Sequence, residues 1–113
     1  MSFINIEKIK SLELVTGFPA RFVHTDNLTM AFFSPKAGAV LPLHSHEHEQ
    51  ISNVLSGEFE LTIDGVTRLL KPGVVARIPS HARHSGRAIT DCELLDIFHP
   101  VREDYRLAQE NEE

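Results

Sequence analysis

The sequence predicts an all-β protein, a sandwich or barrel of short strands followed by a short C-terminal helix. Runs rich in β-branched and aromatic residues recur between turn residues along most of the chain. Helical periodicity is scarce before residue 101. At 113 residues, of which 42% are hydrophobic, the chain suits one domain, which we place at 1–113.

The expected strands follow one another with turn residues between them. Asp64-Gly65 is the strongest turn, because Asp-Gly between two strand-like runs is typical of a type I′ hairpin. Gly57 and Pro72-Gly73 mark further boundaries. The runs with strand character cover residues 12–17, 20–25, 28–34, 39–46, 50–56, 58–63, 66–71, 74–79 and 93–100.

The last segment, VREDYRLAQENEE at 101–113, has a different pattern. Pro100 suits the start of a helix, and Val101, Tyr105 and Leu107 form a thin apolar stripe. We therefore expect a short helix that frays toward an acidic end.

Charge and composition argue against several classes of partner. A net charge of −5 leaves no basic face for nucleic acid, so an anionic ligand would need a local concentration of positive charge. A single cysteine, Cys92, cannot form an intramolecular disulfide, which fits a reducing compartment. Charged residues interrupt the N-terminal segment, and no stretch reaches the roughly 20 apolar residues of a membrane span. We expect a cytoplasmic protein without a membrane partner.

The stretch HSHEHEQ at residues 44–50 is the first candidate for chemistry. His44 and His46 project to the same face of an extended segment, and a turn would bring Gln50 back beside them. His84, in PSHARHSG, is a candidate fourth ligand. The alternatives are exposed turn histidines and, for Gln50, a strand-edge amide. His48 suits the turn itself, and His81, His24 and His99 have no motif that supports them.

The spacing of these residues resembles the cupin family. From Gly38 to Gly57 the chain reads G, five residues, H-x-H, three residues, Q, six residues and G, which is the first cupin motif except for the glutamine. Gly73, five residues, Pro79 and then His84 resemble the second motif. The resemblance implies a double-stranded β-helix (jelly-roll) barrel that holds a metal in its mouth.

Two positions depart from the superfamily pattern. Gln50 stands where a glutamate is usual, and His81 stands where a glycine is usual. Three imidazoles and an amide carry no charge, so they would leave the full charge of a divalent metal to polarise and attract a carboxylate. These donor types do not select among Zn, Ni, Fe and Mn.

A narrower resemblance covers roughly residues 26 to 106. HSHEHEQISNVLSGEFELTIDG and LLDIFHPVREDY are similar to small single-domain cupins of pectin degradation, which linearise 4,5-unsaturated uronates. In that group the fourth metal ligand is a glutamine, which matches Gln50. The resemblance implies metal ligation by His44, His46, Gln50 and His84. The last strand of that group carries a D-x-F-x-P-x-R-E-D pattern, which this chain matches with Asp96, Phe98, Pro100, Arg102, Glu103 and Asp104.

Alternation along ELLDIFHP places Asp96 and Phe98 on the same strand face as Leu94. A carboxylate on an apolar face must meet a cation, gain hydrogen bonds or hold a proton, and each suits a general acid or base. Arg102 could bind a substrate carboxylate with two hydrogen bonds. The alternatives are an Asp96–Arg pair that serves stability and an Arg102 exposed on the helix near Glu103 and Glu110.

Together the residues and the resemblance predict a metal-dependent enzyme that converts cyclic 4,5-unsaturated uronates from pectin or alginate into linear 4-deoxy-5-keto uronates. Asp96, Arg102 and Phe98 are the expected catalytic residues, the substrate is a small anionic sugar, and a homodimer is expected from the behaviour of small cupins. Two alternatives remain open at this point. One is an oxygen-dependent cupin dioxygenase on a small acid, and the other is a cupin that binds a small molecule without chemistry.

Overall fold

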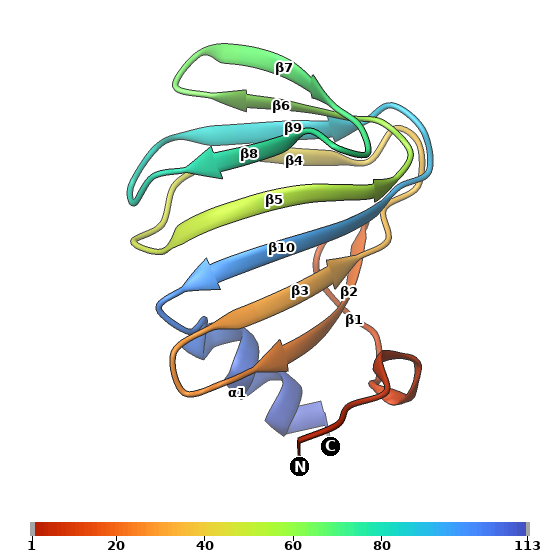
Figure 1. The fold of residues 1–113 in the computed structure, drawn as a ribbon, viewed down its shortest axis with the longest axis vertical. Coiled ribbons are helices and arrows are strands. Elements are labelled where there is room, and N and C mark those ends of the chain that lie inside the picture. The colour runs from red at the N-terminus through yellow and green to blue at the C-terminus, as the bar shows by residue number, and fades with distance from the viewer. Residues whose placement is uncertain (1, 113) are drawn as a thin grey trace.

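The protein folds into two antiparallel sheets that face each other across a common interior (Figure 1), which confirms the all-β fold class. The structure, a computed structural model, describes residues 2–112. The sheet of six strands has the order β1-β2-β3-β10-β5-β8, and the sheet of four has the order β4-β9-β6-β7. The strands are β1 (Leu12–Val15), β2 (Phe18–His24), β3 (Thr29–Phe33), β4 (Val40–His44), β5 (Glu49–Ser56), β6 (Phe59–Ile63), β7 (Val66–Leu70), β8 (Val75–Ile78), β9 (His84–Ala88) and β10 (Glu93–His99).

One strand and one short helix escaped the sequence analysis. Strand β9 reads HSGRA, and it lacks the β-branched and aromatic residues that identify the other strands. It is a strand because it lies between β4 and β6 and pairs with both. A 3₁₀ helix, η1 (Ile6–Lys8), begins after Asn5, whose side chain accepts a hydrogen bond from the Glu7 amide.

The predicted hairpin at Asp64-Gly65 is confirmed. It joins β6 to β7, and Ile63 pairs with Val66. Asp64 has φ 46° and Gly65 has φ 82°, the two positive values that a type I′ turn requires.

Strand β10 lies in the middle of the six-stranded sheet, between β3 and β5, as Figure 1 shows. Its buried positions are Leu94, Asp96 and Phe98, so the alternation expected from the sequence is confirmed. Asp96 pairs in register with Ser52 of β5, and Phe98 pairs with Gln50. This register places three polar side chains of two neighbouring strands on the face that points into the interior.

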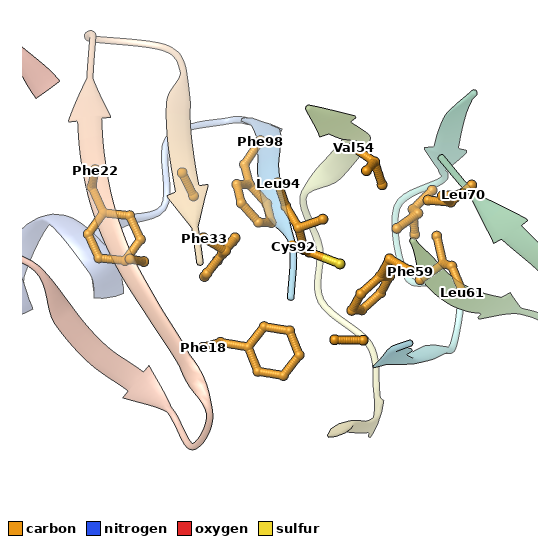
Figure 2. Packing of buried hydrophobic residues seen from close by; sticks show 14 of the residues in the cluster. Phe18, Phe22, Phe33, Val54, Phe59, Leu61, Leu70, Cys92, Leu94 and Phe98 are labelled. Carbon is orange, nitrogen blue, oxygen red and sulfur yellow. The ribbon is translucent and has the colours of Figure 1, made fainter. Parts of the chain in front are cut away.

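Aromatic side chains fill the interior between the sheets (Figure 2). The ring of Phe18, from β2, lies edge-on to Phe33 of its own sheet at 6.3 Å and to Phe59 of the opposite sheet at 6.1 Å. Edge-to-face aromatic pairs stabilise a core beyond the area that they bury. The two sheets are thus joined at this end by Phe18, while the opposite end keeps a cavity.

The C-terminal helix expected over 101–113 begins two residues later, as α1 (Glu103–Glu112), and Glu113 lies outside the described residues. It packs beside β2 (Figure 1), where Tyr105 stacks on Phe22 with ring centres 4.7 Å apart. Gln109 also donates a hydrogen bond to the Phe22 carbonyl. Among residues 2–112, no helix has the length and apolar character needed to cross a membrane.

Candidate metal centre and active site

Every predicted ligand and catalytic residue except His84 lines one cavity of about 490 Å³. Its floor toward Phe18 and Phe59 is apolar. Its opposite end is lined by polar side chains from β4, β5 and β10, from the loop between β4 and β5, and from Arg102 and the first turn of α1. Those polar residues are His44, His46, Gln50, Ser52, Asp96, Arg102 and Asp104.

Three histidines converge at the polar end. His44 ends β4, His84 begins β9, and His46 lies in the loop between β4 and β5. One ring nitrogen from each of them lies within 4.8 Å of the others, a spacing that a single metal ion can bridge. The sequence spacing thus brought together residues that are 40 positions apart in the chain.

Backbone carbonyls fix how each imidazole is presented. The Nδ1 atom of His44 lies 2.8 Å from the Pro42 carbonyl, that of His46 lies 3.0 Å from the His48 carbonyl, and that of His84 lies 2.9 Å from the Ala82 carbonyl. A carbonyl oxygen only accepts, so each Nδ1 must carry the hydrogen. In a neutral imidazole the Nε2 atom then bears a free lone pair, which is the form that binds a metal.

The loops that carry these histidines are tied to each other. The His81 amide donates to the His46 carbonyl at 2.8 Å, and the Ser80 hydroxyl donates to the Glu47 carbonyl at 2.5 Å. His81 itself is exposed in a turn with φ 67°. The contribution of His81 to the site is therefore the hydrogen bond of its backbone amide, and not its ring.

Gln50 faces the histidines with its oxygen. Its Nε2 donates to Asp96 Oδ2 at 2.7 Å, so its Oε1 is directed at His46, 3.0 Å from His46 Nε2. With His46 protonated on Nδ1, two lone-pair atoms face each other at hydrogen-bonding distance, and no hydrogen lies between them. Such a pair is unfavourable alone and favourable around a cation.

Burial favours the uncharged form of two of the imidazoles, those of His46 and His84. Desolvation, with a smaller contribution from the positive charge of Arg102, lowers the pKa of His46 to about 4. Desolvation likewise lowers the pKa of His84. The Nε2 atom of His84 is buried and has no hydrogen-bond partner within the described part of the chain. An orphaned buried nitrogen beside two further lone pairs fits a metal ion, so the residues present suit the group that cupins hold.

Asp96 lies behind Gln50 and is 6% exposed. It accepts hydrogen bonds from Gln50 Nε2 at 2.7 Å and from the Ser52 hydroxyl at 2.8 Å. Burial raises the pKa of Asp96 to about 6, and these two hydrogen bonds act in the opposite direction. The alternative of an Asp96–Arg pair is wrong, because the ion pairs of residues 2–112 do not include Asp96.

Arg102 lines the cavity and packs against two aromatic rings that stand perpendicular to each other. Its guanidinium carbon is 4.9 Å from the centre of the Phe98 ring and 3.9 Å from that of Tyr105. The side chain is only 11% exposed, so the alternative of a helix-surface arginine is wrong. It pairs with Asp104 and not with Glu103 or Glu110. Phe98 is 2% exposed and contributes both to the core and to the cavity wall.

The sequence analysis did not identify two contacts of the site, the hydrogen bonds of Ser52 with Asp96 and of Arg102 with Asp104. Each has a signal in the sequence. Ser52 is two residues from Gln50 on one strand, so the alternation that selected Asp96 also places Ser52 on the inner face. Asp104 is two residues from Arg102 within the motif already quoted, but its partner depends on the path of the chain into α1. Of the other histidines, His48 is half-buried near Phe98, His24 contacts Thr29, and His99 is exposed.

Comparison with known proteins agrees with this geometry. A family described as the cupin domain matches residues 31–98. The pectin degradation protein KdgF of Dickeya dadantii (strain 3937) is 32% identical over 96 residues, which cover 82% of this chain and 87% of that protein. The structure of KdgF from Halomonas sp. has a TM-score of 0.86 at 32% identity and covers 92% of this chain and 99% of that one. An RmlC-like cupin from Shewanella frigidimarina NCIMB 400 has a TM-score of 0.87 at 29% identity, over 93% of this chain and 96% of the other.

Proposed function

Because this chain belongs to the cupin family and is a relative of the KdgF pectin degradation proteins, we propose that it opens the ring of cyclic 4,5-unsaturated uronates. The product is the linear 4-deoxy-5-keto uronate. The observation that carries the proposal is the cavity itself, which combines an uncharged donor set, a buried carboxylate and a cation in its lining.

The donor set suits a divalent metal ion held by His44, His46, Gln50 and His84. Such an ion supplies Lewis acidity for an oxygen-rich, anionic substrate, and no ligand in the set would cancel its charge. The three Nδ1 hydrogen bonds to backbone carbonyls orient the rings in advance, so that each Nε2 lone pair is directed at the place where the ion would bind.

Arg102 is the proposed anchor for the substrate carboxylate. A guanidinium binds a carboxylate through two parallel hydrogen bonds, and the rings of Phe98 and Tyr105 pack against that of Arg102. Phe98 also offers a flat apolar surface to the sugar ring, next to the polar groups.

Asp96 is the proposed proton carrier. The reaction is an isomerisation: the hydroxyl on C1 loses its proton, the bond from C1 to the ring oxygen breaks, and C4 gains a proton as C5 becomes a ketone. No oxidant or reductant is needed. Asp96 lines the cavity, and none of the ion pairs of residues 2–112 includes it, so a carboxylate in this place can take the proton from the C1 hydroxyl and return it at C4.

The test is the rate at which the enol-ether absorbance of an unsaturated galacturonate disappears, with and without the protein. We expect acceleration that is lost on chelation and restored by a divalent metal. Equal rates with and without the metal-loaded protein would contradict the proposal. Elemental analysis of the same preparation reports whether it holds one metal per chain.

Oxygen uptake with the iron-loaded protein and a panel of small acids separates this reaction from that of a dioxygenase. We expect none above the protein-free rate. Unchanged binding of a uronate together with no turnover by either assay would favour a protein that only binds.

A further inference from the structure

Arg102 already has a carboxylate on it in this structure. Its Nε donates to Asp104 Oδ1 at 3.0 Å and its Nη2 donates to Asp104 Oδ2 at 2.8 Å. This two-bond fork is the geometry with which arginine binds a free carboxylate. Both side chains line the cavity, so Asp104 lies where the carboxylate of a ligand would bind.

Asp104 is not needed to hold the guanidinium in place. Phe98 and Tyr105 cover the guanidinium, and the Arg102 backbone amide donates to Thr29 Oγ1 at 2.9 Å. Thr29 is fully buried. The position of Arg102 therefore follows from its neighbours and its backbone, and the fork satisfies its charge.

The two partners differ in their exposure to water. The Arg102 side chain is 11% exposed and needs an anionic partner, whereas that of Asp104 is 60% exposed and can turn to solvent. Burial acts to raise the pKa of Asp104, but the hydrogen bonds and charge of Arg102 outweigh it and lower the pKa overall. If the carboxylate of a ligand replaces that of Asp104, Arg102 has an anionic partner both before and after the exchange.

We propose that Asp104 is a specificity-determining residue that occupies the carboxylate-binding edge of Arg102 until an anionic ligand exchanges with it. The inference rests on the proposed function, in which Arg102 anchors the carboxylate of a uronate. A ligand with a carboxylate can displace Asp104 and restore both hydrogen bonds. A neutral sugar cannot displace Asp104, so the Arg102–Asp104 pair excludes it from this edge. The same pair weakens the binding of acids, because each acid must first displace Asp104.

The chain contains its own reporter for this exchange. Tyr105 is the only tyrosine, there is no tryptophan, and the Tyr105 ring lies 3.9 Å from the Arg102 guanidinium carbon. Its fluorescence should change when the anion on Arg102 changes. Titration of the full-length, metal-loaded protein with D-galacturonate, which is saturated and does not react, then gives a dissociation constant without turnover.

The decisive variant is Asp104→Asn, and Glu103→Gln is its matched control. Both remove one negative charge from the first turn of α1, but Glu103 pairs with Arg106, 3.4 Å away, and does not contact Arg102. We expect Asp104→Asn to bind galacturonate roughly two- to fivefold more tightly, the range for an ion pair with an exposed partner. Glu103→Gln should match the wild-type constant, and galactose, which the pair excludes from the wild type, should bind only to Asp104→Asn.

Equal or weaker binding of galacturonate by Asp104→Asn, relative to Glu103→Gln, would overturn the inference. Asp104→Ser removes the fork in a second way, so a folding defect in one variant does not decide the result. The outcome is independent of turnover. Tighter galacturonate binding without ring opening would sustain the exchange and remove the proposed function, whereas ring opening without tighter binding would do the reverse.

Discussion

The two halves of the cavity are held in different ways. The histidines of the donor half are oriented by three backbone carbonyls, those of Pro42, His48 and Ala82. The anion-binding half is held by hydrogen bonds between side chains. Ser52 and Gln50 donate to Asp96, and Arg102 donates to Asp104. Backbone contacts form with the fold and persist, while contacts between side chains can exchange with a ligand.

This difference suggests a division of labour. The donor half would keep its shape whether or not a metal or substrate is bound, and the anion-binding half would rearrange during each turnover. Gln50 belongs to both halves, because its oxygen faces His46 and its nitrogen donates to Asp96. Substitutions in the two halves should therefore have different effects, which range from the loss of bound metal to a small decrease in the free energy of unfolding.

The largest effect is expected in the donor half. His84→Ala removes a fully buried ring whose Nε2 has no partner within residues 2–112. We expect bound metal to fall well below one per chain and the ring-opening rate to fall at least about 100-fold, measured by elemental analysis and by absorbance. The exposed His81→Gln serves as the control and should keep both. Full metal content in His84→Ala would contradict its place in the donor set.

Asp96→Asn should separate chemistry from metal binding. The amide keeps an acceptor for Gln50 and a donor that Ser52 can accept, so Gln50 stays oriented. We expect a loss of about 10²- to 10⁴-fold in kcat with little change in metal content. If metal and activity were lost in parallel, Asp96 would belong with the donors and the division between the halves would fail.

Arg102→Lys should change substrate binding more than the chemical step. Lysine keeps the charge but offers no planar fork and stacks less well on Phe98 and Tyr105. We expect KM for the unsaturated uronate to rise by roughly 10-fold, with a smaller change in kcat. Initial rates over a range of substrate concentrations check this split, and an unchanged KM would remove Arg102 as the anchor.

The smallest effect is expected at Ser52. Ser52→Ala removes one of the two donors to the buried Asp96 and leaves the three histidines untouched. The free energy of unfolding should drop by about 1.5–3 kcal/mol, the range for a hydrogen bond to a charged group. Urea unfolding of the metal-free protein measures it. Ser52→Thr, which keeps the hydroxyl, should recover most of the loss, and no recovery would point to packing instead.

Much of the fold was predictable because alternation and turn chemistry are local. The Asp64-Gly65 hairpin and the inward face of β10 depend on neighbours in sequence, and both are confirmed. Strand β9 was not predicted, because HSGRA has no strand character and only its position between β4 and β6 makes it one. Its Gly86 lies against the Phe59 ring, where a side chain would not fit.

The residues of the candidate site likewise divide into those that local sequence predicts and those that depend on the tertiary fold. Motif spacing was enough to bring His44, His46 and His84 together, but their function as ligands stays a prediction. The partner of Arg102 could not be predicted, because Glu103, Asp104 and Glu110 all lie within reach of it in the sequence and alternation does not choose among them. The path from β10 into α1 decided among them, and it is a tertiary feature.

The ties between the two histidine loops have one more consequence. Since the Ser80 hydroxyl and the His81 amide bind carbonyls of the 45–48 loop, the coordination shell has little left to order when an ion arrives. We expect the emptied protein to stay folded and to take up a replacement ion quickly. Which element occupies the centre in a cell would then follow from supply as much as from selection.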